Sequence, residues 1–124
     1  MKARWAVLAL VAACSGCGTA QFYEGPRRDP DDVAHISGDL RVTAGAPVSV
    51  ILRQVDGQRL GLGQNAVDVL PGKHELLVDC QIAETHSVSR HSIQVEVWPG
   101  RRYRLRAETG AGLRQCTDVT LETV

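Results

Sequence analysis

The sequence predicts an all-β fold, a small antiparallel β-sandwich of about seven strands. Apolar and polar residues alternate with period two over several short stretches, and Asp-Gly or Pro-Gly pairs separate those stretches. No helical period of 3.6 persists for ten residues after the N-terminal segment. The chain has 124 residues, of which 44% are hydrophobic and 23% charged, and this composition indicates one globular domain.

The N-terminal residues 1–17, MKARWAVLALVAACSGC, have the pattern of an export signal. Lys2 and Arg4 form a positively charged start, and an apolar run of nine residues follows at 5–13. A helix needs about 20 apolar residues to span a bilayer, so this run is too short for a transmembrane segment. We therefore expect the segment to direct export.

The end of the signal resembles the lipobox of bacterial lipoproteins, in which cleavage occurs just before a cysteine that receives diacylglycerol. Cys17 follows Ser15-Gly16, the commoner ending, and Cys14 follows Val11-Ala12-Ala13, which fits the motif better but leaves a very short signal. We predict a lipoprotein signal peptide at 1–16 with lipidation at Cys17, and Cys14 is the alternative. An ordinary cleaved signal without lipid is the third reading.

The resemblance also implies a destination. Neither cysteine is followed by Asp, the residue that retains enterobacterial lipoproteins in the inner membrane. The expected location is therefore the periplasmic face of the outer membrane, where acyl chains hold the protein. Each buried CH₂ contributes about 0.8 kcal/mol, so two or three chains give a persistent anchor.

The next segment differs in composition from the domain that follows. Residues 18–32 contain two Pro, two Gly and six charged residues, so we expect 17–32 to be the lipidated cysteine and a flexible tether. Phe22 and Tyr23 are the two residues there that could dock on the domain. Residues 33–124 are the expected sandwich domain.

Within the domain, the alternation predicts strands at 48–53, 75–82, 93–97, 102–107 and 118–122. Asp56-Gly57 fits a two-residue hairpin, because Gly accepts a positive φ. Pro71-Gly72 and Pro99-Gly100 fit type II turns, with Trp98 at the end of the second expected hairpin.

Two cysteines remain in the domain, and the periplasm is oxidising, so we predict a Cys80–Cys116 disulfide. It would close a loop of about 35 residues and contribute about 3–4 kcal/mol. Cys80 has the parity of the apolar face, whereas Cys116 has the parity of the polar Asp118 and Thr120. A bulge, or a position just before the strand, would bring Cys116 inward; two separate thiols are the alternative.

Three arginines form the most suggestive surface feature. Arg102, Arg104 and Arg106 alternate along one strand and should project from one face about 7 Å apart. Guanidinium groups bind phosphates or carboxylates in a bidentate manner, so lipopolysaccharide, peptidoglycan or an acidic envelope protein are candidate partners. The alternative is cross-strand pairing with Glu96 and other acids, which contributes little.

The sequence gives little support for catalysis, metal binding or nucleic-acid binding. No Gly-x-Ser-x-Gly elbow or phosphate loop occurs, and His86 and His91 lack further ligands at zinc spacing, so we expect no catalytic residue, metal site or cofactor. Removing Lys2 and Arg4 with the signal leaves 12 basic against 14 acidic side chains, a charge of about −2. This balance argues against a nucleic-acid partner.

Several motifs resemble known families. Tyr23-Glu24-Gly25-Pro26, followed by Asp32-Val33-Ala34-His35-Ile36, resembles the opening of small gammaproteobacterial "YEGP" lipoproteins, with Asp32 where Glu is commoner. Val55-Asp56-Gly57, Leu70 to Leu76 and Trp98 to Leu105 are similar to the turns of PEGA-type β-sandwich modules. The resemblance implies a non-catalytic envelope domain and carries over no functional residue beyond the lipidated cysteine.

These observations predict a lipid-anchored lipoprotein of the cell envelope with a structural or binding role. The first alternative is an accessory subunit of an envelope complex that acts by strand-edge pairing. A periplasmic enzyme is the least favoured reading.

Overall fold

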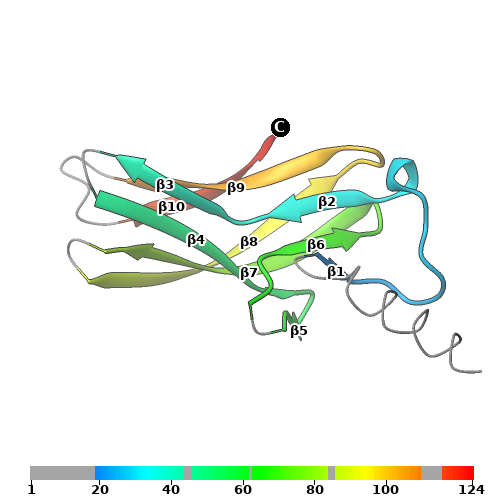
Figure 1. Ribbon diagram of the computed structural model, residues 1–124, viewed down its shortest axis with the longest axis horizontal. Coiled ribbons are helices and arrows are strands. Elements are labelled where there is room, and N and C mark those ends of the chain that lie inside the picture. The colour runs from blue at the N-terminus through cyan, green and yellow to red at the C-terminus, as the bar shows by residue number, and fades with distance from the viewer. Residues whose placement is uncertain (1–18, 44–45, 62, 84–85, 110–115) are drawn as a thin grey trace, which may run out of the picture.

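The computed structural model describes residues 19–43, 46–61, 63–83, 86–109 and 116–124 (Figure 1). The expected signal peptide at 1–16 and both candidate lipidation sites, Cys14 and Cys17, lie outside the described residues. No helix within the described ranges is long and apolar enough to cross a membrane.

The described residues form ten strands and one short 3₁₀-helix, η1. In chain order they are β1 Ala20–Gln21, η1 Pro30–Asp32, β2 Ala34–Ser37, β3 Asp39–Thr43, β4 Ala46–Val55, β5 Gln58–Arg59, β6 Ala66–Val69, β7 Gly72–Ile82, β8 Ser87–Val97, β9 Arg102–Thr109 and β10 Cys116–Thr123.

The strands form two sheets packed face to face, which confirms the all-β sandwich. Sheet A has the order β1-β6-β2-β9-β10, and sheet B has the order β3-β4-β7-β8 with β5 paired to β4 (Figure 1). Most pairs are antiparallel, but β1 pairs with β6 and β2 with β9 in parallel. The structure has more strands than the seven expected because β1 and β5 have two residues each, and β2 and β6 have four, too few for a clear alternation.

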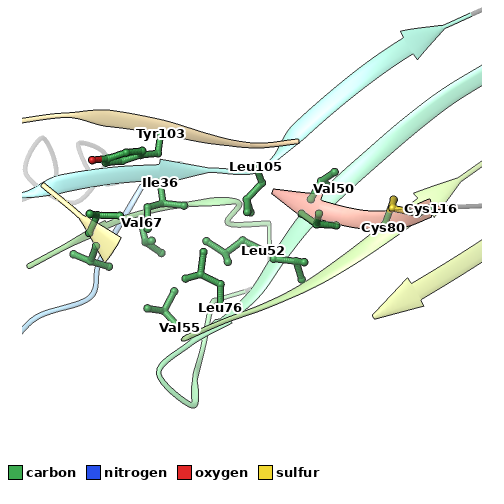
Figure 2. Packing of buried hydrophobic residues seen from close by; sticks show 14 of the residues in the cluster. Ile36, Val50, Leu52, Val55, Val67, Leu76, Cys80, Tyr103, Leu105 and Cys116 are labelled. Atoms are coloured by element: carbon green, nitrogen blue, oxygen red, sulfur yellow. A yellow bond between two sulfur atoms is a disulfide. The ribbon is translucent and has the colours of Figure 1, made fainter. Parts of the chain in front are cut away.

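The core lies between the sheets and is built from the inward-facing residues of the alternating strands (Figure 2). In β9, Tyr103 and Leu105 are buried, while the arginines that alternate with them are exposed. The core cluster consists of Ala34, Ile36, Val48, Val50, Leu52, Val55, Val67, Val69, Leu76, Val78, Cys80, Ile82, Val97, Tyr103, Leu105, Cys116 and Val119.

Between β2 and β3 the chain crosses from sheet A to sheet B at Gly38. A Cβ at Gly38 would lie 2.3 Å from the carbonyl oxygen of Val50 and 2.3 Å from the Asn65 amide, so only glycine fits. Asn65 holds the chain in place at this crossing. Its side-chain oxygen accepts a hydrogen bond from Leu52 N at 2.8 Å, and its backbone carbonyl accepts one from Gly38 N at 2.8 Å.

The turns follow the sequence prediction in part. Asp56 and Gly57 have φ of 51° and 83° and close the β4–β5 hairpin, as expected. Gly72 and Gly100 also have positive φ. The Pro99-Gly100 turn does not close a hairpin, however, because it connects β8 of sheet B to β9 of sheet A. Alternation is a local property and does not specify which sheet a strand joins.

The Cys80–Cys116 disulfide forms in the structure and links β7 of sheet B to β10 of sheet A (Figure 2). The two Cα atoms are 6.4 Å apart, and the cysteines are 36 residues apart in sequence. A bulge lies between Cys116 and Asp118, so two successive exposed residues separate Cys116 from the next buried residue, Val119. The bulge resolves the conflict of parity and turns the Cys116 side chain inward.

The expected tether contacts the sandwich. Ala20 and Gln21 pair with Val67 and Asp68 of β6, Phe22 N donates to Asp68 O at 2.9 Å, and the Phe22 ring packs against the core. The described part of this segment therefore has hydrogen bonds to the edge of sheet A. It is held there because β6 has an open edge and Phe22 supplies an apolar contact.

Candidate functional site

A row of charged and polar side chains crosses the outer face of sheet A. His35 lies opposite Asp68 on β6 and opposite Arg102 on β9. The His35 Nδ1 atom hydrogen-bonds to Asp68 Oδ1 at 2.9 Å, and both side chains are about four-fifths buried. Three adjacent strands thus hold an acid, an imidazole and a guanidinium in one line.

The N-terminal segment folds across the end of this row and forms a cleft of about 630 Å³. We call it the arginine cleft. The residues that line it are Thr19, Arg27, Arg28, Asp29, Pro30, Asp31, Val33, His35, Asp68, Gly100, Arg101 and Arg102. A volume of this size is typical of small-molecule sites.

Backbone contacts fix the two segments that carry the cations. The loop before β9 is held by two hydrogen bonds, from Gly100 N to Val33 O at 2.9 Å and from His35 N to Arg101 O at 3.0 Å. In the N-terminal segment, Arg28 N donates to the Tyr23 hydroxyl at 3.0 Å. The walls of the cleft therefore have defined backbone positions before any ligand arrives.

The arginine cleft has a small positive excess. Arg27, Arg28, Arg101 and Arg102 contribute four positive charges against three carboxylates, and one of these carboxylates, Asp68, is already bonded to His35. In the described part of the chain, none of the four guanidinium groups forms an ion pair.

The three arginines singled out in the sequence share one exposed face of β9 but have different surroundings. Arg102 lines the arginine cleft, and Arg104 lies further along the strand, outside it. Arg106 donates to Glu122 of β10 at 2.9 Å, and this hydrogen bond and the charge of Glu122 raise the pKa of Arg106. The acid that pairs with β9 is therefore Glu122, whereas Glu96 lies on β8 in the other sheet.

An exposed tryptophan belongs to the loop whose later residues, Gly100 and Arg101, line the cleft. Trp98 precedes the Pro99-Gly100 turn, and 59% of its surface is exposed. Its backbone N–H donates to the Tyr103 hydroxyl at 2.9 Å, so the loop is anchored while the indole faces solvent. The same loop thus presents an aromatic ring and, three residues later, Arg101.

Sheet B carries a second arginine cluster on its outer face. The Asp79 side chain is only 6% exposed and accepts from Arg53 Nε at 2.8 Å and from Arg90 Nε at 2.9 Å. The Arg90 hydrogen bond lowers the pKa of Asp79; burial opposes this, and the Arg53 hydrogen bond reinforces it. A bulge between Leu52 and Gln54 places Arg53 and Gln54 between the buried residues Leu52 and Val55, so Val55 still faces the core while Arg53 contacts Asp79 on the outer face.

A third polar contact joins two turns. Asp56 accepts from Glu75 N at 2.8 Å and bonds to His74 Nδ1 at 2.5 Å, and His74 Nε2 donates to Leu70 O at 2.6 Å. Burial raises the pKa of Asp56, but the Glu75 hydrogen bond and the His74 contact outweigh it and lower the pKa overall. This contact is structural, because both ring nitrogens of His74 already have hydrogen-bond partners within the chain.

A serine and a histidine also contact each other on β8. Ser89 Oγ and His91 Nε2 are 3.0 Å apart on β8, and none of the described hydrogen bonds joins His91 to a carboxylate. Within the described ranges, no group of three or more His, Cys, Asp or Glu side chains could hold a metal ion.

The architecture and the site define a two-sheet β-sandwich with an arginine-lined cleft at the end where its N-terminal segment docks. Comparisons with protein-family models, with curated proteins and with solved structures find no match for the chain.

Sequence reasoning missed half of the cleft. Arg27 and Arg28 lie in the segment 17–32 that the sequence predicts as a flexible tether, so their approach to Arg102 is not expected from the sequence. The signal that could have found them is the pair of successive arginines in each segment, at 27–28 and at 101–102. Their meeting depends on the docking of residues 20–22 onto β6, which no local pattern encodes.

Proposed function

We propose that the protein is a lipid-anchored lipoprotein of the cell envelope with a non-catalytic binding role, attached to the periplasmic face of the outer membrane. The observation that carries the proposal is the segment from Lys2 to Cys17, which has the charge, length and cysteine ending of a lipoprotein signal. The Cys80–Cys116 disulfide supports it, because such bonds persist in oxidising compartments.

The docked N-terminal segment adds a spatial argument. If Cys17 is the anchor, only Gly18 and Thr19 separate it from β1. Three residue steps span at most about 10 Å, so the sandwich would rest at the membrane surface with its β1 end toward the lipid. The "YEGP" motif would then form part of the membrane-proximal loop, where Tyr23 receives a hydrogen bond from Arg28 N.

The test is the intact mass of the protein extracted from native membranes, with and without reduction. We expect a chain that begins at Cys17, carries acyl chains and gains two hydrogens on reduction. A Cys17→Ala variant should lose the acyl chains, and the matched Cys14→Ala variant should keep them. An unacylated wild-type chain would remove the anchored lipoprotein from consideration.

A second candidate function is that of an accessory subunit that pairs through a strand edge. The observation that favours it is β8, which ends sheet B, spans 11 residues and pairs only with β7 among the described strands. It pairs with β7 without a bulge and contains no Pro or Lys, the features that usually protect an edge strand.

In-cell photocrosslinking distinguishes this candidate. A crosslinking residue at Gln94 on β8 should capture one recurrent protein, whereas the same residue at Glu75, opposite it on the interior strand β7, should not. A smear of abundant proteins from both positions would count against strand-edge pairing.

A further inference from the structure

The arginine cleft holds cations that the described protein leaves without an acidic partner. Three arginines elsewhere have acidic partners, since Arg53 and Arg90 share Asp79 and Arg106 binds Glu122. Among the described residues, Arg59 and Arg104 resemble the cleft arginines in forming no ion pair. Arg59, however, lines a pocket whose other two arginines share Asp79, and Arg104 lies outside the arginine cleft. The four guanidinium groups of the cleft outnumber its three carboxylates by one, and this positive excess attracts an anion. The two unbonded carboxylates, Asp29 and Asp31, belong to the N-terminal segment and do not form ion pairs with them.

The cleft is formed by the fold. Val33 and Arg101 backbone atoms hold the two cationic segments together through the hydrogen bonds to Gly100 and His35 described above. Gly100 has φ of 76°, and a Cβ there would lie 3.5 Å from Asp31 O, so the two segments lie close together at this point. A preformed site binds its ligand without the cost of ordering loops.

The chemistry of the lining selects the ligand class. Arginine forks bind oxyanions in a bidentate manner, and phosphate, with several acceptor oxygens, can engage guanidinium groups from two sides of a cleft. Thr19, which also lines the cleft, lies two residues after the proposed anchor Cys17. Trp98 is exposed in the same loop as Arg101, and tryptophan is enriched where proteins meet the lipid headgroups.

We propose that the arginine cleft binds a phosphate group, which in the anchored protein is that of an anionic lipid headgroup. The phosphate chemistry stands on the cleft alone. The assignment to a lipid headgroup rests on the proposed function, because it requires the β1 end of the sandwich to lie at the membrane.

The test uses phenylglyoxal, which modifies free guanidinium groups, on the membrane-extracted full chain reconstituted into vesicles. In phosphatidylcholine vesicles that contain phosphatidylglycerol, modification of Arg101 and Arg102 should be about tenfold slower than in pure phosphatidylcholine, as expected for one charge-assisted contact. Arg104 is the internal control, because it is exposed on the same face of β9 but lies outside the cleft. Equal slowing at Arg104 would indicate only a general surface charge and would overturn the proposal.

Soluble probes separate the two sources of phosphate. Inorganic phosphate and glycerol phosphate are added to the protein in pure phosphatidylcholine vesicles, with glycerol as the neutral control. Protection by anionic vesicles but not by inorganic phosphate supports the headgroup. Protection by inorganic phosphate with none from anionic vesicles overturns the headgroup assignment, and no protection by any probe overturns the site.

Paired variants test the sign of the charge. Arg101→Gln/Arg102→Gln should abolish the protection of Arg27 and Arg28, whereas Asp29→Asn/Asp31→Asn should increase it, because it removes negative charge from the cleft. The reverse order would overturn an anionic ligand. The mass of the acylated chain is measured on the same samples, so an unacylated chain that still binds glycerol phosphate refutes the anchor and leaves the phosphate site intact.

Discussion

The Asp79 cluster on sheet B and the arginine cleft at the end of sheet A differ in how the charge of their arginines is compensated. On sheet B, Arg53 and Arg90 surround the buried carboxylate of Asp79, so their charge is compensated within the fold. At the end of sheet A, Arg101 and Arg102 line the arginine cleft together with Arg27 and Arg28. The difference teaches that the exposure of an arginine says little about its role, and that the position of the nearest acid decides whether it stabilises the fold or is left for a ligand.

The disulfide should make the largest single contribution to the free energy of unfolding, because it joins sheet A to sheet B. We expect Cys80→Ala/Cys116→Ala to lower the free energy of unfolding by about 3–4 kcal/mol through loss of the loop constraint. Urea unfolding followed by the fluorescence of Trp98 and by far-ultraviolet circular dichroism measures it. Two separated transitions would show that the faces unfold independently and would break the comparison.

The Asp79 cluster should contribute most of the electrostatic stability. We expect Asp79→Ala to lower the free energy of unfolding by about 2 kcal/mol, because it removes a buried acceptor and leaves two arginines without their partner. The matched Asp68→Ala, on the other face, should cost less than about 1 kcal/mol, since a single contact to His35 is lost. Equal losses in urea unfolding would contradict the asymmetry of the two faces.

Acid should weaken sheet B through the same carboxylate. The folded-state pKa of Asp79 lies below its ordinary value, chiefly because of the Arg90 hydrogen bond, so the unfolded state binds more protons in acid. The contribution is present above the unfolded pKa and is lost as the pH falls through the folded pKa. Urea midpoints measured from neutral to acidic pH should therefore fall less steeply for Asp79→Asn than for the wild type. The Arg101→Gln/Arg102→Gln variant should follow the wild-type profile.

The cleft arginines should matter little for stability. We expect Arg101→Gln/Arg102→Gln to change the free energy of unfolding by less than about 0.5 kcal/mol, because the described structure gives their side chains no ion pair. Urea unfolding without phosphate measures this change. A loss as large as that of Asp79→Ala would show that these arginines are structural.

The smallest effect belongs to the exposed Arg106–Glu122 pair. We expect Glu122→Gln to shift the urea midpoint slightly at low ionic strength and not at all in about 1 M salt, where the Debye length is ~3 Å. A shift that persists at high salt would mean that the pair contributes more than an ordinary surface contact.

The sequence predicts the strands better than it predicts their neighbours. Alternation in 48–53 and 75–82 identified β4 and β7, and the Asp56-Gly57 pair identified the β4–β5 hairpin. The sequence also predicted the Cys80–Cys116 disulfide, and it predicted a bulge as one way to bring Cys116 inward. These features are local or follow from the chemistry of single residues, so one sequence can carry them.

The candidate site was less accessible to sequence reasoning. Arg102 was identified, but its partners in the cleft lie about seventy residues earlier in the chain and reach it through the parallel β2–β9 pairing. Composition predicted a flexible tether at 17–32, because Pro, Gly and charge are common there, and Phe22 was identified as a residue that could dock on the domain. The hydrogen bonds that join this segment to the edge of β6 were not predicted. Pairing between distant segments depends on the whole fold and leaves no periodic trace.

The two-residue strand β1 gives the proposed anchor a mechanical property. If Cys17 carries the lipid and β1 is bound to β6, only Gly18 and Thr19 separate the lipid from the sandwich. A pull on the domain would load this short parallel pair first, since the core beyond it is larger and is stapled by the disulfide. If β1 separated from β6, residues 17–32 would become a linker that extends to about 50 Å. Under tension the linker between the proposed anchor and the sandwich would lengthen, and it would shorten again when β1 pairs with β6.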